Sequence, residues 1–330
     1  MENGTKKINS YHLLDVEVIT EPNKEIRDHL GSMVQGTPGG LTFINTNFHL
    51  KLNHLGEPYF LTLKKAGRLL GTICLVHRPL YHENSVISTW YLRYFHVKAP
   101  LRATSGRQRN LRRDSPAANR IILSAIEKYF TNPEILLPEE KQNMQSLLFG
   151  FIVKNNLRSS KWADQVGIFP YKSLKLFIFT RLNPIDDERV QKITTDAIPG
   201  MKEKLGEFYK DYSLYTDQNL FYDNNYYIIR ERDEIVAGMQ ANPEEWNIID
   251  RPGISGFISH KILPRIPQLS KILNLKEFRF AGIEGVYFKT GYEHLLSSLL
   301  ETVCYRYRIH FAFCYTDLHS PLMATLRQHV

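Results

Sequence analysis

Six basic side chains crowd into residues 98–114 of this 330-residue chain, where a single acidic residue accompanies them. The six are Lys98, Arg102, Arg107, Arg109, Arg112 and Arg113. Their excess of five positive charges is more than half of the formal net charge of +8. Guanidinium groups donate paired hydrogen bonds to phosphate oxygens, so this stretch predicts a phosphate-binding loop. A solvated basic loop without a ligand is the alternative.

A second candidate lies where the apolar run 146–153 gives way to two asparagines. Asn156 opens a short helical stretch that closes at Gly167. One interpretation is purely structural, with Asn156 as the N-cap and Gly167 as the C-cap of a helix. The other interpretation is that this strand–helix corner lines a cofactor site. The neighbouring elements are needed to decide between the two.

Apolar patterning in the first half predicts strands and helices on both sides of the basic loop. The predicted strands cover 13–20, 85–97, 146–153 and 174–182, a β-hairpin covers 59–80, and helices cover 23–34, 115–130 and a stretch from 156. Ser115 as N-cap and Pro116 in the first turn mark the start of the helix after the basic loop.

A weaker version of the same order follows, which indicates an internal duplication. Its hairpin covers 224–241, followed by an irregular stretch over 242–275, a strand over 277–288, a helix over 290–307, a strand over 308–317 and a helix from 320. Gly71 and Gly238 hold similar places in the two hairpins, and Asn156 and Asp317 hold similar strand ends.

We therefore expect two domains, at 1–184 and 205–330, joined by a linker over 185–204. The second copy stops at Val330, where the first copy continues into another strand. Either the fold is completed differently or the chain is a fragment.

One motif connects these elements to a known family. The strand that ends at Val97 is followed after four residues by Arg102, and Gly106 lies between Ser105 and Arg107. With the element order over 10–182 and, more loosely, 205–330, this segment resembles the coenzyme A segment of the GNAT-type acyl-CoA N-acyltransferase superfamily, with Ser105 and Arg107 in place of glycines. The resemblance implies an α/β fold of tandem GNAT-like domains, each a mixed, mostly antiparallel sheet flanked by helices.

The resemblance also implies acetyl-CoA as co-substrate, with its pyrophosphate held by loop amides at a helix N-terminus. The residues that it assigns to coenzyme A are Phe95, Val97, Arg102, Gly106, Arg107, Ser115, Asn156 and Ser159. The backbone of Phe95–Val97 would pair with the pantetheine amides as an added strand does.

The stretch after Asn156 matches the superfamily at Ser159 and Gly167 but carries Ala163 where the family has a tyrosine. That tyrosine serves as general acid for the leaving thiolate, so coenzyme binding is better supported than the usual acid. The resemblance places Ser159 near the thioester sulfur. Trp162 and Phe169 are expected in the core.

Acyl transfer to an amine requires the amine to be neutral, so a nearby base helps. His96 lies on the expected cofactor strand, and histidine has a suitable titration range. His96 is therefore the predicted base, and Ser159 is the second predicted catalytic residue. A packed or surface histidine is the alternative. Glu83 is a weaker candidate.

We therefore expect an N-acyltransferase that moves an acyl group, with acetyl as the first candidate, directly to the amine of a small molecule or peptide. An aminoacyl-tRNA donor is a minor variant. A non-catalytic sensor or scaffold that binds coenzyme A or another phosphate ligand is the alternative class, and a nucleic-acid-binding module rests on charge alone. In the second half Glu293 follows Gly291 in place of a small residue, so we expect that half to shape the cleft without its own cofactor site.

Other classes of protein are disfavoured by composition. No apolar run approaches about 18 residues and no signal-peptide core is present, so we expect a cytoplasmic protein without a membrane span. Cys74, Cys304 and Cys314 include no CxxC pair and lie in apolar surroundings. They predict buried thiols and argue against a disulfide scaffold and a structural zinc site, and no metal is expected.

Overall fold

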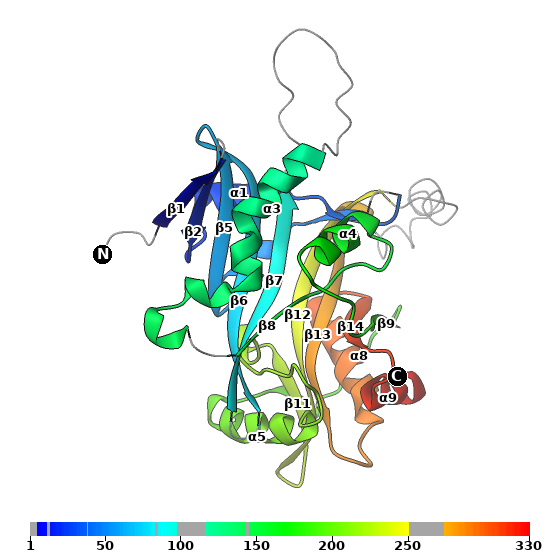
Figure 1. Ribbon diagram of the computed structural model, residues 1–330. Helices are drawn as coiled ribbons and strands as arrows, with labels where there is room; N and C mark the ends of the chain where they lie inside the picture. Colours follow the sequence, from blue (N-terminus) through cyan, green and yellow to red (C-terminus); the bar gives the residue numbers. More distant parts are fainter. Residues whose placement is uncertain are drawn as a thin grey trace. The chain divides into compact units, whose positions relative to one another are not determined.

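The chain forms two compact units (Figure 1). The computed structural model describes residues 5–11, 14–37, 39–82, 85–97, 116–142, 145–250 and 274–330. Unit 1 comprises Met1–Met33 and Lys51–Phe169, and unit 2 comprises Val34–Leu50 and Pro170–Val330. The chain therefore enters unit 2 briefly, returns to unit 1, and leaves it again after Phe169.

Unit 1 is built on a six-stranded sheet in the order β1-β2-β5-β6-β7-β8. Its strands are β1 (Thr5–Tyr11), β2 (Leu14–Ile19), β5 (Glu57–Lys65), β6 (Arg68–His82), β7 (Ser85–Val97) and β8 (Ser146–Gly150). Neighbouring strands are antiparallel except β7 and β8, which run parallel. Its helices are α1 (Lys24–Gly31), α3 (Pro116–Thr131) and α4 (Leu157–Gln165), with 3-10 turns at Pro133–Leu136 and Glu139–Lys141.

Unit 2 is built on an eight-stranded sheet with the main order β10-β11-β12-β13-β14-β9, in which β4 pairs with β12 and β3. Its strands are β3 (Gln35–Gly36), β4 (Thr42–Asn45), β9 (Leu174–Thr180), β10 (Val190–Lys192), β11 (Tyr226–Glu231), β12 (Glu234–Asp250), β13 (Phe278–Phe288) and β14 (Phe311–Asp317). Its helices are α2 (Phe48–Leu52), α5 (Ile198–Phe208), α8 (Leu295–Tyr307) and α9 (Pro321–His329), with 3-10 turns at Thr195–Ala197, Tyr222–Asn224 and Leu275–Glu277. Here β13 and β14 form the parallel pair. Two mixed, mostly antiparallel sheets with helices confirm the expected architecture.

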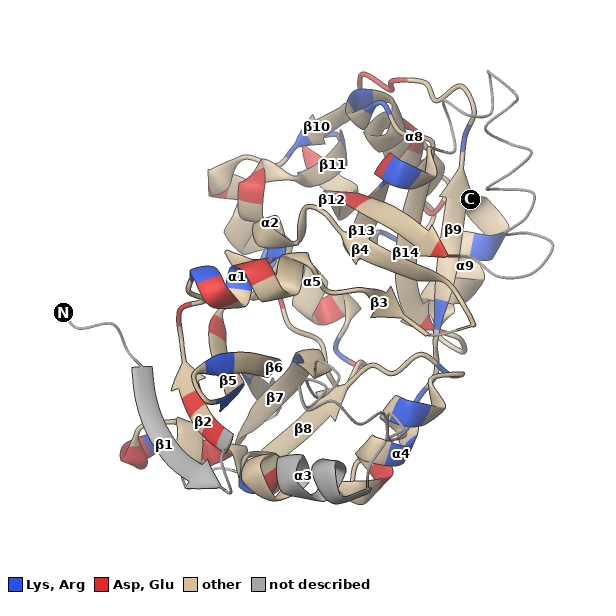
Figure 2. Cartoon of the chain, turned by 90° about the horizontal axis from the view of Figure 1, so that it is seen from above, with Lys and Arg blue, Asp and Glu red and all other residues tan. Residues whose placement is uncertain are grey.

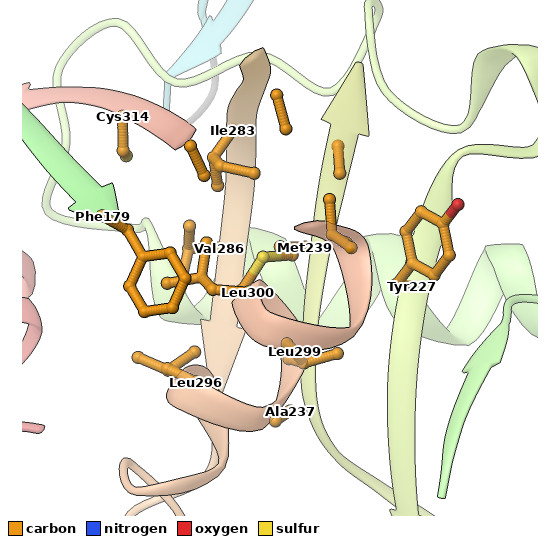
Figure 3. Packing of buried hydrophobic residues seen from close by; sticks show 14 of the residues in the cluster. Phe179, Tyr227, Ala237, Met239, Ile283, Val286, Leu296, Leu299, Leu300 and Cys314 are labelled. Carbon is orange, nitrogen blue, oxygen red and sulfur yellow. The ribbon is translucent and has the colours of Figure 1, made fainter. Parts of the chain in front are cut away.

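Each unit has its own apolar core. In unit 2, α8 packs against the sheet through a stripe of residues three and four positions apart, a spacing that places them on one helix face. The stripe consists of Leu295, Leu296, Leu299, Leu300 and Val303. Figure 3 shows Leu296, Leu299 and Leu300 of this stripe near Met239 and Val286 of the sheet. The cysteines Cys74, Cys304 and Cys314 are buried and free, as expected.

The segment after α4 was placed differently from the sequence prediction. Strand β9 was expected to complete the first sheet, but it pairs antiparallel with β14 in the second. The expected linker over 185–204 contains β10 and most of α5, and β10 pairs with β11. The second fold is thus completed by a strand from the middle of the chain. Local apolar patterning predicts that a segment is a strand, but not which edge it joins.

The internal duplication is visible in a matching β-bulge in each sheet. An extra residue on β7 puts Tyr94 at φ 48°, and an extra residue on β13 puts Gly285 at φ 55°. In each sheet the neighbouring parallel strand makes its last pair two residues before the bulge. That strand's residue in this pair is Gly150 in one sheet and Cys314 in the other. The bulges therefore give a common origin for counting along the two copies.

Counting from the bulges changes the correspondences expected from the sequence. Asn156 lies six residues after Gly150 and Ser320 lies six residues after Cys314, so Asn156 matches Ser320 and not Asp317. Gly71 pairs with the residue three past one bulge and Ala237 with the residue three past the other, so Gly71 matches Ala237 and not Gly238. A comparison of the two halves by sequence position alone does not locate the bulges. The pairs Gly71/Gly238 and Asn156/Asp317 were therefore misaligned.

Gly71 is required by the close approach of β6 to the end of β7. A Cβ at this position would lie 2.6 Å from the carbonyl oxygen of His96 and 3.0 Å from the Cα of Val97. We predict that Gly71→Ala destabilises the protein by about 1–3 kcal/mol, as overpacking does. Chemical denaturation would measure this, with Gly206→Ala in α5 as the control, because nothing lies within 4 Å of a Cβ there. Equal stability of the two variants would contradict the prediction.

Candidate functional site

The parallel pair in unit 1 separates part-way along β7. One edge of β7 pairs with β6 as far as Val97, whereas the other edge pairs with β8 only up to Leu92, opposite Gly150. In the part of the chain that the structure describes, no strand follows the second edge over Tyr94–Val97. A strand edge without a neighbouring strand is the kind of surface to which an extended ligand can add.

The bulge at Tyr94 lies at the point of separation. The Thr72 hydroxyl, fully buried on β6, donates to the Tyr94 carbonyl oxygen at 3.3 Å. A left-handed conformation is uncommon for a tyrosine, and bulges of this kind re-aim the backbone of a strand. The bulge therefore redirects the peptide groups of β7 just where β8 leaves it.

The chain beyond β8 leaves the sheet with its apolar side chains exposed. Phe151, Ile152 and Val153 have 62%, 42% and 60% of their surface accessible. At the end of the pairing, a Cβ on Gly150 would lie 3.2 Å from the Cβ of Leu92, so a larger residue would force the strands apart earlier. An apolar stretch thus follows directly from the open edge of β7.

The corner at Asn156 has the structural caps that the sequence predicted. The Asn156 Oδ1 accepts a hydrogen bond from the Ser159 N–H at 3.1 Å and so caps α4. At the other end Gly167 has φ 76°, and the Ile168 N–H donates to the Ala163 carbonyl at 2.9 Å. The capping interpretation is confirmed, and the cofactor role of Asn156 and Ser159 stays a prediction beside it. Ala163 is 4% exposed, and its methyl side chain offers no hydroxyl at the position where the family has a tyrosine.

Helix α4 is anchored to the open end of β7 by aromatic packing. The Trp162 ring lies 4.3 Å from that of Phe95 and 5.0 Å from that of Phe130, centroid to centroid. Phe95 and Val97 both pack against the core of unit 1. Trp162 is partly buried and packs against the core of unit 1, whereas Phe169 is 74% exposed, so the expectation that Phe169 lies in the core was wrong.

His96 lies between Phe95 and Val97 and has a histidine partner. Because side chains alternate along a strand, it points to the other face of the sheet, toward α1. Its Nδ1 lies 3.1 Å from Nε2 of His29, which is 3% exposed. His96 is a predicted site residue, whereas His29, which is 67 residues away in the chain, was not predicted. No local signal connects two residues at that separation.

The remaining predicted contacts lie outside the described residues. They are Arg102, Gly106, Arg107 and Ser115, with the rest of the basic loop and Glu83. Their roles stay predictions. Of the predicted site residues within the described ranges, Phe95, His96 and Val97 lie on β7, and Asn156 and Ser159 lie at the start of α4.

The equivalent loop in unit 2 carries its own anion. The Glu293 Oε1 accepts a hydrogen bond from the Gly291 N–H at 3.1 Å. Backbone hydrogen bonds from Glu293 itself and from Gly291 lower the pKa of this carboxyl. The loop just before α8 is where phosphate would bind in a coenzyme site, and here a side-chain carboxylate takes those amides. This arrangement supports the expectation that the second copy has no cofactor site.

Three hydrogen-bonded side chains in unit 1, Glu57, His77 and Ser88, have the order of a catalytic triad. His77 contacts the Glu57 Oε2 at 2.8 Å through Nδ1 and the Ser88 Oγ at 3.1 Å through Nε2. However, Ser88 is 0% exposed, so no substrate reaches its hydroxyl. These hydrogen bonds therefore connect β5, β6 and β7, and Ser88 does not act as a nucleophile.

Metal-binding clusters and membrane-spanning helices are both absent from the described residues. They contain no group of three or more His, Cys, Asp or Glu side chains placed to hold a metal ion. Within the same residues, no helix has the length and apolar character needed to cross a membrane.

The fold of the chain is similar to the fold of solved N-myristoyltransferase structures. The crystal structure of Saccharomyces cerevisiae N-myristoyltransferase with bound myristoyl-CoA matches 98% of this chain and 80% of its own, with a TM-score of 0.52 and 10% identity. A second structure of the yeast enzyme, with bound myristoyl-CoA and inhibitors, matches 94% of this chain and 76% of its own, with a TM-score of 0.50 and 10% identity. No family model and no curated protein sequence matches the chain. The tandem GNAT-like fold is therefore confirmed.

The Glu293 carboxylate generates a prediction about pH. Its lowered pKa means that it stabilises the fold above its ordinary value near 4.5, and that this stabilisation is lost as the pH falls through the lowered value. We expect Glu293→Gln to lower the melting temperature at pH 7 and to match the wild type at the acid end. Glu203→Gln, exposed on α5, is the control. If Glu293→Gln is as stable as the wild type at pH 7, the Glu293 carboxylate does not stabilise the fold.

Proposed function

We propose that this protein is an acyl-CoA-dependent N-acyltransferase whose donor site lies in unit 1. The observation that carries the proposal is the open edge of β7 over Tyr94–Val97, beside the bulge and opposite the end of β8. An extended pantetheine arm can add to this edge through backbone hydrogen bonds. The second copy carries the Glu293 carboxylate in its loop, which favours a single donor site in the chain.

In the proposed reaction the neutral amine of the acceptor attacks the thioester carbonyl directly. The new C–N bond forms, the C–S bond breaks, and coenzyme A leaves as a thiolate. His96 takes the proton released from the amine nitrogen. A backbone N–H near the bulge would stabilise the charge that develops on the carbonyl oxygen. Ala163 offers no proton to the thiolate, so the thiolate is either released as such or protonated by solvent.

The acyl group is the finer part of the proposal. Acetyl is the first candidate for the acyl group. A longer chain is the second candidate, because Phe151, Ile152 and Val153 expose apolar surface immediately after β8. The two yeast structures contain myristoyl-CoA. The acceptor is proposed as an amine of a small molecule or peptide.

A non-catalytic role is the second candidate function. It is favoured by one observation, the buried Ala163 at the position expected for an acid. A sensor or scaffold would bind coenzyme A without turnover. The cytoplasm is the proposed compartment for either role, and the three free, buried cysteines agree with a reducing environment.

Donor binding is tested by thermal shift with acetyl-CoA, myristoyl-CoA, coenzyme A and ADP. A ligand that binds only the native state raises the melting temperature according to its affinity. We expect an acyl-CoA to stabilise the wild type, and Arg102→Ala to weaken this effect by removing a phosphate contact. Absence of any shift at millimolar ligand would overturn the proposal.

Asn156 has a matched control in the second copy. Asn156→Ala and Ser320→Ala each remove a helix N-cap, which costs about 1 kcal/mol. We expect only Asn156→Ala to reduce the stabilisation by acyl-CoA as well. An equal ligand effect in both variants would reduce Asn156 to a structural cap.

Turnover separates the enzyme from the scaffold. Release of free thiol from the stabilising acyl-CoA, measured with a panel of amines and peptides, is expected for the enzyme. Binding without thiol release across the panel would favour the scaffold.

A further inference from the structure

The histidine pair of unit 1 joins the predicted donor strand to helix α1. His29 lies in the last turn of α1, and His96 lies two residues past the bulge on β7. Their rings are tilted by 45° with centroids 4.9 Å apart, and one nitrogen of each ring meets the other at 3.1 Å. This is a nitrogen-to-nitrogen hydrogen bond, so one ring must supply the proton and the other the lone pair.

The number of protons on the pair determines whether this bond exists. With both rings neutral, either ring can donate to the other. With one ring charged, the charged ring donates from both of its nitrogens and the neutral ring accepts, which makes the bond charge-assisted and stronger. With both rings charged, two N–H groups face each other and the bond is lost. The geometry therefore favours the uptake of one proton and opposes the uptake of a second.

Burial decides which ring holds that proton. His29 is 3% exposed, and charging a buried ring costs desolvation free energy. His96 is only partly buried, so its charged form retains more hydration. The charge is then expected on His96, with its Nδ1–H donated to Nε2 of His29.

We propose that His29 is a positioning residue that accepts the Nδ1–H of His96, so that the pair takes up a single proton and holds it on His96. The orientation of the His96 ring and its basicity thus depend on a side chain from another element. This role rests on the proposed function, in which His96 receives the amine proton. The proton uptake itself is a property of the pair and is testable without a substrate.

The ionisable groups on the surrounding elements define the background for this titration. On α1, Glu25 lies one turn before His29 and is paired with Lys64 of β5, which also contacts Glu17 of β2. Figure 2 shows residues of both charge signs on α1, where Lys24 and Asp28 form an exposed pair.

The bulge residue Tyr94 has ionisable neighbours. Arg93 and Tyr91 of β7, Cys74 of β6 and Lys51 of α2 interact with it, and burial raises the pKa of the Cys74 thiol to about 12. Cys74 therefore stays neutral over the range in which histidines titrate. None of these charged or titratable groups is altered in the variants below, so changes in the titration report on the pair.

The test is a pH titration of the full chain labelled with ¹⁵N-histidine, followed by long-range ¹H–¹⁵N correlation spectra. Ring ¹⁵N shifts report the tautomer and the charge of each histidine separately. We expect His96 to charge first while His29 stays neutral as an acceptor at Nε2, with the second proton taken up only at a much lower pH. Two rings that titrate independently near about 6.5, or a His29 that charges first, would overturn the inference.

Two variants sharpen the test. His29→Leu removes the acceptor, and we expect His96 to bind its proton about tenfold more weakly, which moves its midpoint down by about one pH unit. His29→Gln retains an acceptor oxygen and is expected to restore most of the shift. His49→Gln, exposed on α2, is the control and should leave the titration unchanged. An unchanged midpoint in His29→Leu contradicts the inference, and the wild-type titration decides the question if that variant does not fold.

The same samples separate this inference from the proposed function. Acyl-CoA binding is read by thermal shift, and the proton pair is read by ¹⁵N shifts. If the histidine pair titrates as expected but no acyl-CoA binds, the proposed acyltransferase function is wrong and the inference about the pair still holds. If acyl-CoA binds but the two rings titrate independently, only the proposed role of His29 is wrong, and the proposed function still holds.

Discussion

Strands β7 and β8 share only five residue pairs, from Ser88 to Leu92, and the end of this short parallel pairing creates the candidate site of unit 1. Beyond it the bulge at Tyr94 re-aims the backbone of β7, and the chain after Gly150 leaves the sheet. A parallel pair that continued to Val97 would satisfy every backbone group and leave no place for an extended ligand. The separation creates the open edge on which the proposed donor site depends.

The separated strands need support from outside the ladder. Helix α4 provides it on one face, where Trp162 packs against Phe95. On the other face α1 provides it through His29 and His96. The end of β7 is thus held between two helices by an aromatic contact and a polar one, and its edge stays unpaired within the described residues.

The two copies of the fold have diverged in the groups that meet their loops and strand ends. Both retain the bulge and an N-cap at the following helix, Asn156 in one copy and Ser320 in the other. In the second copy the Glu293 carboxylate takes the amides of the loop before α8. A side chain that is always present at a site competes with any external anion, so this carboxylate disfavours phosphate binding at the loop before α8.

Residues close together in the chain were enough to predict most of the larger helices and strands, the caps at Asn156 and Gly167, the buried cysteines and the family resemblance. Only the tertiary structure decided that β9 joins the second sheet, because an apolar strand fits any sheet edge of suitable register. It alone located the bulges, which add one residue without a sequence signal, and it alone brought His29 to His96. Interactions between distant residues depend on how the elements pack, and a single sequence does not specify that packing locally.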